Sequence, residues 1–306
     1  MARFAVLGNT GVDITLQGAL PSAPAGSDGW TDRNVRFLDQ SPAAVVAGNG
    51  GAAAHVLARL GEQVTLVTAL GTDPFGRMAR DQLEGVGVEI RTEEDATTPV
   101  NIIGVAEAGG RASAYYTGSS VPWKFVLEDR FDWVFAAGYG QVGLEDLDTL
   151  GAIFGTVRNG GGKVAFDPGP WFARAPFLVR LKEVVEGVDC VLGTEEELGG
   201  VVSESDVETI ASRLLSSGPA CAAVKRGRAG ALVATESGVV HQPVDPVEDA
   251  HSVGAGDCFN AVFLSAFARG RSPSEAVRSA VEFSRRVVEG GGGAAGASMD
   301  GLFDSV

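Results

Sequence analysis

Short apolar runs alternate with helical patterns along most of the chain. Runs of about four to eight apolar residues without alternation are typical of strands that are buried on both faces. The predicted strands are 4–7, 63–70, 131–137, 163–166, 190–192 and 222–225, and the predicted helices are 52–60, 77–83, 144–158, 177–186, 258–268 and 274–288, with a further helix that starts at the acidic run 194–197. This alternation predicts an α/β fold whose mainly parallel sheet is covered by helices on both faces.

Two stretches interrupt the alternation. Residues 100–105 and 111–116 flank the sequence Glu107-Ala108-Gly109-Gly110, which is typical of a β-hairpin. We expect this hairpin to pair with the strands predicted between residues 12 and 46 as a small lid, with lid strands drawn from about 12–46 and 98–124. Such a lid would exclude water from a site beneath it. A second hairpin is predicted at 231–234 and 239–242.

A glycine-rich turn precedes the most apolar helix. Val253-Gly254-Ala255-Gly256 offers little side chain between a ligand and the backbone, and residues 258–268 carry polar side chains only at Asn260 and Ser265. A helix that is apolar on every face is a buried one. Its N-terminus presents unpaired N–H groups and a partial positive charge, so this turn predicts a phosphate-binding site.

Asp257 lies in the first turn of that helix. We expect the helix dipole and nearby N–H donors to keep its carboxylate ionised. A carboxylate beside a phosphate cradle suits proton abstraction from an attacking hydroxyl. Aspartate is also a good N-terminal cap, so the motif alone leaves both roles open.

Composition narrows the possible partners. The net charge of −15 and the pI near 4.6 argue against nucleic acid and anionic membrane surfaces. The three cysteines lie in apolar runs, which predicts buried thiols in a reducing compartment. No apolar run approaches the roughly 18–20 residues of a membrane span, and no signal-peptide layout is seen, so we expect a cytoplasmic protein.

Three stretches, in this order, resemble the ribokinase-like (PfkB) family of sugar kinases. They are Gly48-Asn49-Gly50-Gly51 with Gly71-Thr72-Asp73-Pro74-Phe75-Gly76, then Val224-Lys225-Arg226-Gly227-Arg228-Ala229-Gly230-Ala231, then Val253 to Asp257 with Phe259-Asn260. The similarity covers nearly the whole chain. It implies a single Rossmann-like kinase domain over residues 1–306, with a small β-sheet lid, that transfers the γ-phosphate of ATP to a sugar hydroxyl with Mg²⁺.

The resemblance also implies roles for individual residues. Asp257 would be the catalytic base, with Gly254, Ala255 and Gly256 as the anion hole. Asp13, Gly48 and Asn49 match positions that hold sugar hydroxyls, and Gln141 is a further candidate by approximate spacing. The remaining matches concern the nucleotide and its metal: Thr194, Lys225, Gly227, Arg228 and Gly230 on the phosphate side, Val281 and Val287 in the adenine pocket, and Glu197 on the Mg²⁺ waters.

Several positions depart from the family pattern. His251 stands where the family usually has an aspartate that helps to hold K⁺, and a neutral imidazole is a poor ligand for that ion. We therefore expect weak or absent K⁺ activation. Thr194 replaces an asparagine, Ala52 replaces the second asparagine of the first stretch, and Gly169 follows Asp167-Pro168 in place of an asparagine. The sugar therefore cannot be taken over from ribokinase.

Other functions compete with a sugar kinase. A nucleoside kinase of the same family needs an aromatic residue to stack on the base, and the lid region offers several: Trp30, Phe37, Tyr115, Tyr116 and Trp123. A non-catalytic sugar sensor is a third possibility, although it would not need Asp257. A nicotinamide-dependent dehydrogenase is disfavoured because Gly8-Asn9-Thr10-Gly11 lacks the dinucleotide spacing. Lids of this kind can exchange strands, so a homodimer through the lid is a further expectation.

Overall fold

Buried apolar strands form one large sheet in the computed structural model, which describes residues 1–18, 35–106, 110–123, 130–138, 144–169, 177–248, 252–294 and 297–303. Within these residues the strand order is β13-β12-β11-β10-β9-β8-β1-β4-β5. All neighbours are parallel except β11–β12 and β12–β13. The strands are β1 (Arg3–Gly8), β4 (Gln63–Val67), β5 (Glu89–Arg91), β8 (Trp133–Ala137), β9 (Lys163–Asp167), β10 (Cys190–Thr194), β11 (Cys221–Lys225), β12 (Ala231–Thr235) and β13 (Gly238–Gln242).

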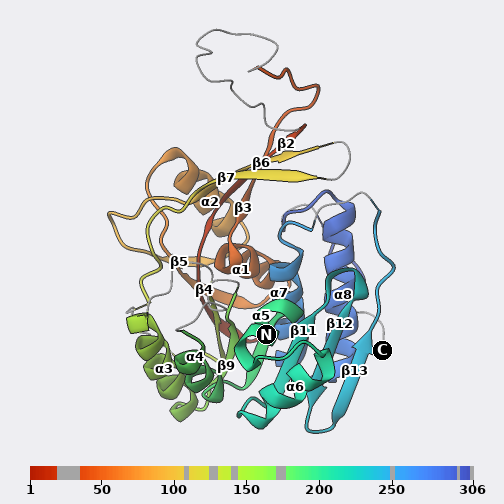
Figure 1. Cartoon of the computed structure of the whole chain (residues 1–306). Coiled ribbons are helices and arrows are strands. Elements are labelled where there is room, and N and C mark those ends of the chain that lie inside the picture. Colours follow the sequence, from red (N-terminus) through yellow and green to blue (C-terminus); the bar gives the residue numbers. More distant parts are fainter. Residues whose placement is uncertain are drawn as a thin grey trace.

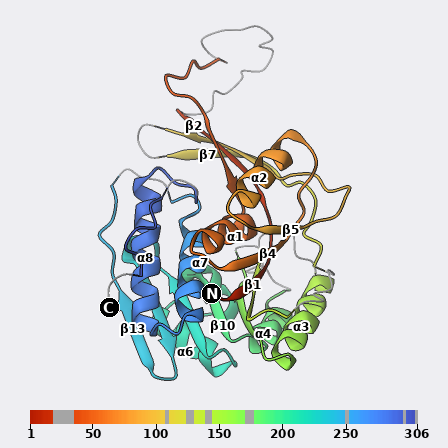
Figure 2. The same ribbon diagram turned by 180° about the vertical axis from the view of Figure 1, so that it is seen from behind.

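Helices cover both faces of this sheet, as the sequence predicts (Figures 1 and 2). Successive side chains of a strand point to opposite faces. Phe4 and Val6 of β1 accordingly pack with α1 (Asn49–Arg59), α2 (Pro74–Glu84), α7 (Ala255–Ala268) and α8 (Pro273–Glu289). Ala5 and Leu7 pack with the other four helices: α3 (Leu144–Asn159), α4 (Phe177–Glu186), α5 (Glu195–Val202) and α6 (Val207–Ser216).

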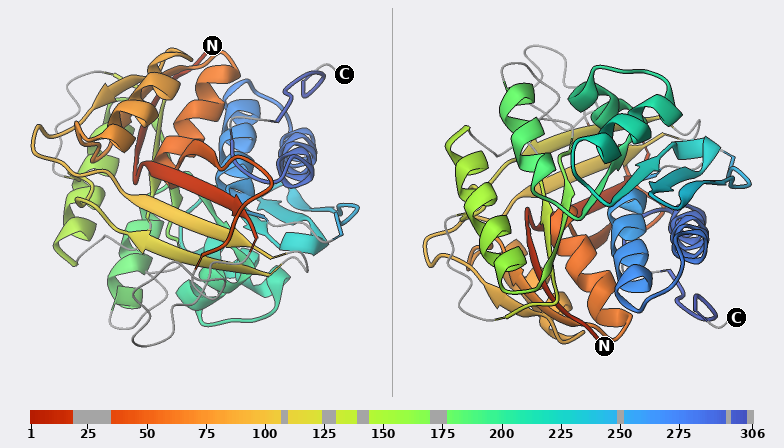
Figure 3. Two further views of the ribbon diagram at one scale, coloured as in Figure 1. Left: turned by 90° about the horizontal axis from the view of Figure 1, so that it is seen from above. Right: turned by 90° about the horizontal axis from the view of Figure 1, so that it is seen from below.

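A second sheet lies across one end of the large one (Figure 3, left). Its order is β3-β2-β6-β7, built from β2 (Gly11–Gln17), β3 (Ala43–Ala47), β6 (Val100–Val105) and β7 (Arg111–Tyr116). The β6–β7 hairpin is antiparallel and β2 pairs with β6 in parallel. The predicted union of the hairpin with the strands of 12–46 is therefore confirmed.

Several boundaries differ from the sequence-based expectation. Helices α1 and α7 begin at Asn49 and Ala255, three residues before the predicted starts, because glycines that suggested loop lie inside the first turn. The short edge strand β5 and helix α6 were not predicted. Strand β5 has charged residues at both ends, so no apolar run marks it. Helix α6 begins shortly after α5 ends, so the sequence pattern does not separate the two helices. In the described part of the chain, no helix is long and apolar enough to cross a membrane.

A buried carboxylate fixes α7 to the start of the chain. The Glu62 side chain is fully buried and accepts hydrogen bonds from Ser265 Oγ (2.7 Å), Arg269 Nε (2.8 Å) and the backbone N–H of Ala2 (2.7 Å). Buried charges are tolerated only when they are paired and hydrogen-bonded. Three donors from two distant segments therefore meet on one acceptor, and α7 is held against β1 and β4.

Glu62→Ala should destabilise the protein by about 3 kcal/mol, because it leaves the Arg269 guanidinium and the Ser265 hydroxyl without their buried acceptor. The free energy of unfolding would be measured by urea denaturation. Glu84→Ala is the matched control, since Glu84 is half-exposed and pairs with Arg80 at 3.9 Å, so its loss should cost less than about 0.5 kcal/mol. Equal losses in the two variants would contradict the role assigned to Glu62.

Candidate active site

Two cavities meet between the lid and the large sheet. The first has a volume of about 430 Å³ and lies beneath the lid. The second, of about 470 Å³, lies beside α8. Thr194, Lys225, Ser252 and Gly256 line both. Because β10 and β11 end at Thr194 and Lys225, the junction lies at the carboxyl ends of parallel strands, where open α/β sheets commonly bind ligands.

The predicted sugar-side residues line the first cavity. Asp13, Gly48 and Asn49 are on its wall. Gly48 has φ of 80°, and a Cβ there would lie 2.5 Å from the Asn9 carbonyl oxygen, so the turn into α1 requires glycine. Asn49 Oδ1 accepts hydrogen bonds from the N–H groups of Asn9 (3.0 Å) and Gly50 (2.9 Å). The Asn49 oxygen is therefore used to hold the turn, which leaves its amide nitrogen for a ligand.

The lid closes this cavity with polar side chains. Asn9 Nδ2 donates to Tyr115 Oη at 2.9 Å, which joins the end of β1 to β7. Burial raises the pKa of Asp13, whereas a hydrogen bond from Asn101 and the Arg111 guanidinium act in the opposite direction. Asn9, Asn101 and Arg111 were not among the predicted substrate residues, and Tyr115 was named only as a possible stacking residue for a nucleoside. In the lid strands every second side chain faces the cavity, and this alternation would have indicated Asn101 and Arg111.

The glycine turn lies where the two cavities meet. Gly254 has φ of 77° and begins α7 without a side-chain cap. The Ala255 N–H donates to Ser252 O at 3.2 Å, within the turn itself. The N–H groups of Gly256 and Asp257 find no acceptor among the described residues. Of the three residues predicted for the anion hole, only Ala255 has its N–H paired within the turn, and the Gly254 N–H, like that of Gly256, has no acceptor in the described part of the chain.

Asp257 lines the first cavity, but it does not have the low pKa expected from the helix dipole. Burial raises its pKa to about 7, against the opposing effect of Lys225, and the neighbouring carboxylates of Asp167, Asp13 and Glu197 raise it further. Desolvation disfavours a charged carboxylate more strongly than the helix terminus favours it. A pKa near neutrality is well matched to a general base.

The positive charge of Lys225 partly offsets the negative charge of these buried carboxylates. Its ammonium donates to Asp167 Oδ2 (2.7 Å) and Asn260 Oδ1 (3.2 Å), and Asn260 Nδ2 donates to the same Asp167 oxygen (2.7 Å). The pKa of Lys225 is raised by Asp167 and Glu197 in spite of its burial. Asp167 and Asn260 were not predicted as site residues. The position of Asp167 at the end of β9 was the available signal.

Thr194 and Glu197 form a capping box at the start of α5. Thr194 Oγ1 accepts from the Glu197 N–H (3.2 Å), and Glu197 Oε2 accepts from the Thr194 N–H (2.7 Å). Both residues also line the first cavity. Burial and the nearby Asp167 raise the pKa of Glu197. Its second carboxylate oxygen has no partner among the described residues and is left for a ligand or water.

The second cavity combines an apolar wall with basic and glycine residues. Gly227, Arg228 and Gly230 line it, as predicted, opposite Phe259 and Val281. Val287, which was also predicted for the adenine pocket, does not line this cavity. It is 1% exposed and packs in the core, and Val288 lines the cavity instead, because neighbouring residues on a helix point about 100° apart.

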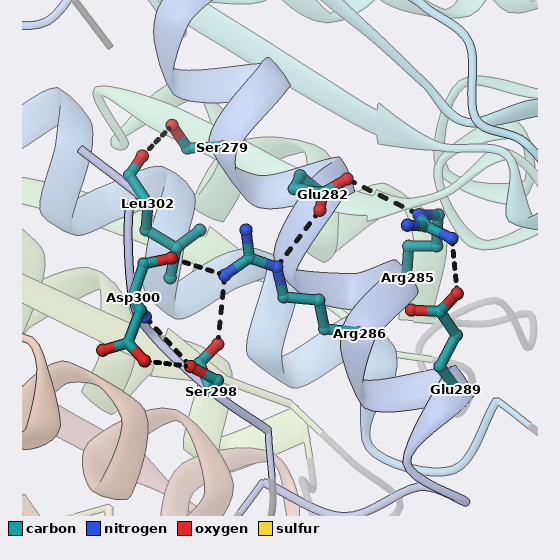
Figure 4. Close-up of polar contacts among 8 residues, drawn as sticks. All are labelled: Ser279, Glu282, Arg285, Arg286, Glu289, Ser298, Asp300 and Leu302. Atoms are coloured by element: carbon teal, nitrogen blue, oxygen red, sulfur yellow. Dashed lines mark hydrogen bonds and ion pairs between the residues drawn. The ribbon is translucent and has the colours of Figure 1, made fainter. Parts of the chain in front are cut away.

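Helix α8 is anchored by residues near the C-terminus (Figure 4). Arg286 Nη1 donates to the carbonyl oxygens of Ser298 (3.3 Å) and Asp300 (2.8 Å), and Ser279 Oγ donates to Leu302 O (2.9 Å). Arg285, which lines the second cavity, is paired with Glu282 and Glu289. The helix that walls this cavity is therefore fixed on its outer side.

The same C-terminal segment reaches the glycine turn. The Gly293 N–H donates to Val253 O at 3.1 Å. Arg59 of α1 donates to the carbonyl oxygens of Ala294 (3.2 Å) and Ala297 (3.1 Å). Gly293 and Ala294 also line the first cavity.

Two predicted positions, Gln141 and His251, lie outside the described residues, as does Trp30.

The raised pKa of Asp257 predicts a pH-dependent cost to stability. A carboxyl whose folded pKa exceeds its unfolded value of 3.8 binds its proton more tightly when folded, so stability is lost as pH rises towards about 7. Asp257→Asn removes this cost. Between about pH 5 and about pH 8, the stability of the ligand-free variant relative to wild type should therefore increase by about 2 kcal/mol.

Urea unfolding at both pH values measures this difference. Asp206→Asn is the control, because hydrogen bonds from Thr209 lower the pKa of Asp206 from 3.8, so this carboxyl is ionised in both the folded and the unfolded state throughout the window and its difference from wild type should not change with pH. A difference between Asp257→Asn and wild type that does not change with pH would contradict the raised pKa.

Comparisons with known proteins agree with this geometry. Residues 32–299 match the model of the pfkB family carbohydrate kinases. A fructokinase of Salmonella typhimurium is 29% identical over 80% of this chain and 85% of its own length. An ATP-dependent ribose-1-phosphate kinase of Halopiger xanaduensis is 29% identical over 87% of this chain and 84% of its own. A nucleoside kinase is also among the relatives.

Solved structures share the fold. An E. coli structure assigned as a ribokinase II, in complex with ATP and Mg²⁺, superimposes with a TM-score of 0.79 over 97% of this chain and 96% of that one, at 21% identity. The ribokinase-like arrangement of a large mainly parallel sheet and a smaller lid sheet is thereby established for this chain. From the family match over most of its length, the chain belongs to the pfkB family of carbohydrate kinases, enzymes that phosphorylate sugars and related compounds.

Proposed function

We propose that this enzyme transfers the γ-phosphate of ATP to a hydroxyl group of a sugar that binds beneath the lid. One observation carries the proposal: the Asp257 carboxyl and the unpaired N–H groups at the start of α7 lie together where the two cavities meet. A base, an anion-binding terminus and two adjoining ligand spaces are the parts that phosphoryl transfer to an alcohol requires.

The second cavity fits a nucleotide. Phe259, Val281 and Val288 offer an apolar surface for a base. In the facing turn the N–H groups of Gly227 and Arg228 have no acceptor among the described residues, whereas those of Ala229 and Gly230 are bonded within the turn. The Arg228 side chain, which pairs with Glu248 at 2.7 Å, offers a cation for phosphates. No cluster of three acidic, histidine or cysteine side chains that would hold a metal directly occurs in the described residues. Mg²⁺ would therefore be bound by the ATP phosphates and water, with Glu197 contacting the water, and it would neutralise phosphate charge.

Asp257 would accept the proton of the sugar hydroxyl. Its pKa of about 7 leaves a large fraction of the carboxyl ionised at neutral pH. The N–H groups of Gly256 and Asp257 would stabilise charge on the transferring phosphoryl oxygens. Lys225 adds a fixed positive charge at the same junction, held in place by Asp167 and Asn260. In this scheme Lys225 contacts the transferring phosphoryl group, whereas the turn of residues 227–230 contacts the outer part of the nucleotide.

A nucleoside is the second candidate substrate. Tyr115 lines the first cavity and offers an aromatic ring to a base, and Trp123 is buried in the core. Asn9 already binds the Tyr115 hydroxyl and fixes the ring at the lid. The polar lining of Asp13, Asn49 and Asn101 favours a ligand rich in hydroxyl groups, so the sugar remains the first candidate. Turnover with a panel of sugars beside a panel of nucleosides distinguishes the two.

Asp257→Asn should lower kcat on the order of 10²–10⁴-fold, because it removes the base and keeps the shape of the side chain. ADP formation with Mg·ATP and a sugar panel measures the rate. Asp206→Asn, a change of the same kind on a surface cap, should leave kcat within about twofold of wild type. An Asp257→Asn enzyme as fast as wild type would end the assignment of Asp257 as base.

The rate should respond little to K⁺. His251 replaces the aspartate that the family pattern uses for this ion, and a neutral imidazole is a poor ligand for it. Turnover would be compared in potassium and in N-methylglucamine salts at equal ionic strength. A large, saturable increase in rate with K⁺ would contradict this expectation.

A further inference from the structure

The lid wall of the first cavity carries a basic side chain. Strand β7 presents alternate residues to the cavity: Arg111, Ser113 and Tyr115 line it. This spacing follows from the period of two in a strand. The same wall receives Asn101 and Ile103 from β6. Arg111 is thus directed at the space that the proposed sugar occupies, although its position at the start of β7 leaves it exposed to solvent.

Arg111 has no hydrogen-bond or ion-pair partner among the residues that the structure describes. The other cation of this cavity, Lys225, is bonded to Asp167 and Asn260. Asp13 is near enough for the Arg111 charge to affect its pKa, but the two side chains form no ion pair. A guanidinium presents several donors in a planar fork that matches the two oxygens of a carboxylate or phosphate.

Two buried oxygen atoms of this cavity are acceptors without a donor. Asn9 Oδ1 and Asn101 Oδ1 are buried and have no partner in the described part of the molecule. Buried polar atoms are rarely left unpaired, so these oxygens indicate donors on a ligand. With Asp13 they would accept hydrogen bonds from hydroxyl groups. Among the described residues, the cavity therefore offers acceptors for hydroxyls and, separately, the unpaired Arg111 cation for an anionic group.

We propose that the substrate is an anionic sugar, a sugar acid or a sugar phosphate, whose charged group is bound by Arg111 of the lid. This inference rests on the proposed function, since it specifies the sugar that Asp257 deprotonates. The relatives do not decide the matter, because a fructokinase and a ribose-1-phosphate kinase are both among them. Binding the anion would also place a ligand contact on β7 and so draw the lid over the site.

Matched pairs of sugars test the proposal. ADP formation with Mg·ATP would be measured for D-gluconate beside D-glucose, fructose 1-phosphate beside D-fructose, and ribose 1-phosphate beside D-ribose. We expect kcat/KM for at least one anionic member to exceed that of its neutral partner by about tenfold or more. The carboxylate and phosphate pairs then show which kind of anion the cavity accepts.

Variants then assign the preference to Arg111. Arg111→Gln should lower kcat/KM for the preferred anionic sugar on the order of 10- to 100-fold, and for its neutral partner less than about twofold. Arg111→Lys should recover part of the loss. Arg80→Gln removes the same charge from a half-buried position on α2 that lines neither cavity, and it should change neither value.

Three outcomes would overturn the inference: a preference for the neutral member of every pair, equal losses for both members in Arg111→Gln, or the same loss in Arg80→Gln. If no sugar yields ADP, the proposed function fails by itself. Calorimetric titration of wild type and Arg111→Gln with the same anionic sugars then decides the role of Arg111. Binding that Arg111→Gln abolishes supports the role, and binding that is absent or unchanged refutes it.

Discussion

The buried contact between Lys225 and Asp167 is the interaction on which the centre of this molecule depends. Four carboxylates line the first cavity: Asp13, Asp167, Glu197 and Asp257. Gathering them in a partly desolvated space is unfavourable unless a cation is present. The Lys225 ammonium supplies that charge from the end of β11, and Asn260 of α7 fixes both members of the pair.

This arrangement links the fold to the chemistry. Lys225 lies at the end of one central strand and Asp167 at the end of another, so the register of the sheet sets their distance. Asn260 belongs to the helix whose first turn carries Asp257. The pair therefore joins the sheet to α7 beside the proposed base. The Glu62 cluster at the other end of α7 performs a similar joining role for the start of the chain.

Much of this architecture could be predicted from the sequence. Apolar runs and helical patterns placed nearly every strand and helix, and the hairpin of residues 100–116 marked the lid. The glycine turn before α7 indicated the anion-binding terminus. The sequence could not show that the Ala255 N–H donates a hydrogen bond within the turn. It also could not show that burial raises the pKa of Asp257 more than the helix dipole lowers it. Both depend on how distant segments pack around the turn, which no local pattern records.

The partners of Lys225 illustrate the same limit. Asp167 and Asn260 are 93 residues apart in the chain, yet Asn260 Nδ2 donates to the same Asp167 oxygen that accepts from Lys225. Each has an ordinary local explanation, as a strand end or as a polar position on a buried helix. Arg111 likewise looks like a typical exposed residue of a hairpin. Its position becomes informative only when the lid is seen to cover a cavity.

The hydrogen bond from Gly293 to Val253 has a consequence for how the protein is made. The turn that begins α7 receives part of its support from a residue close to the end of the chain, and Arg59 holds the neighbouring carbonyls of Ala294 and Ala297. During synthesis on the ribosome, the sheet and most helices can assemble before that segment emerges. The turn before the proposed base cannot be fully supported until it does, so in a nascent chain the sheet can form before this turn is complete.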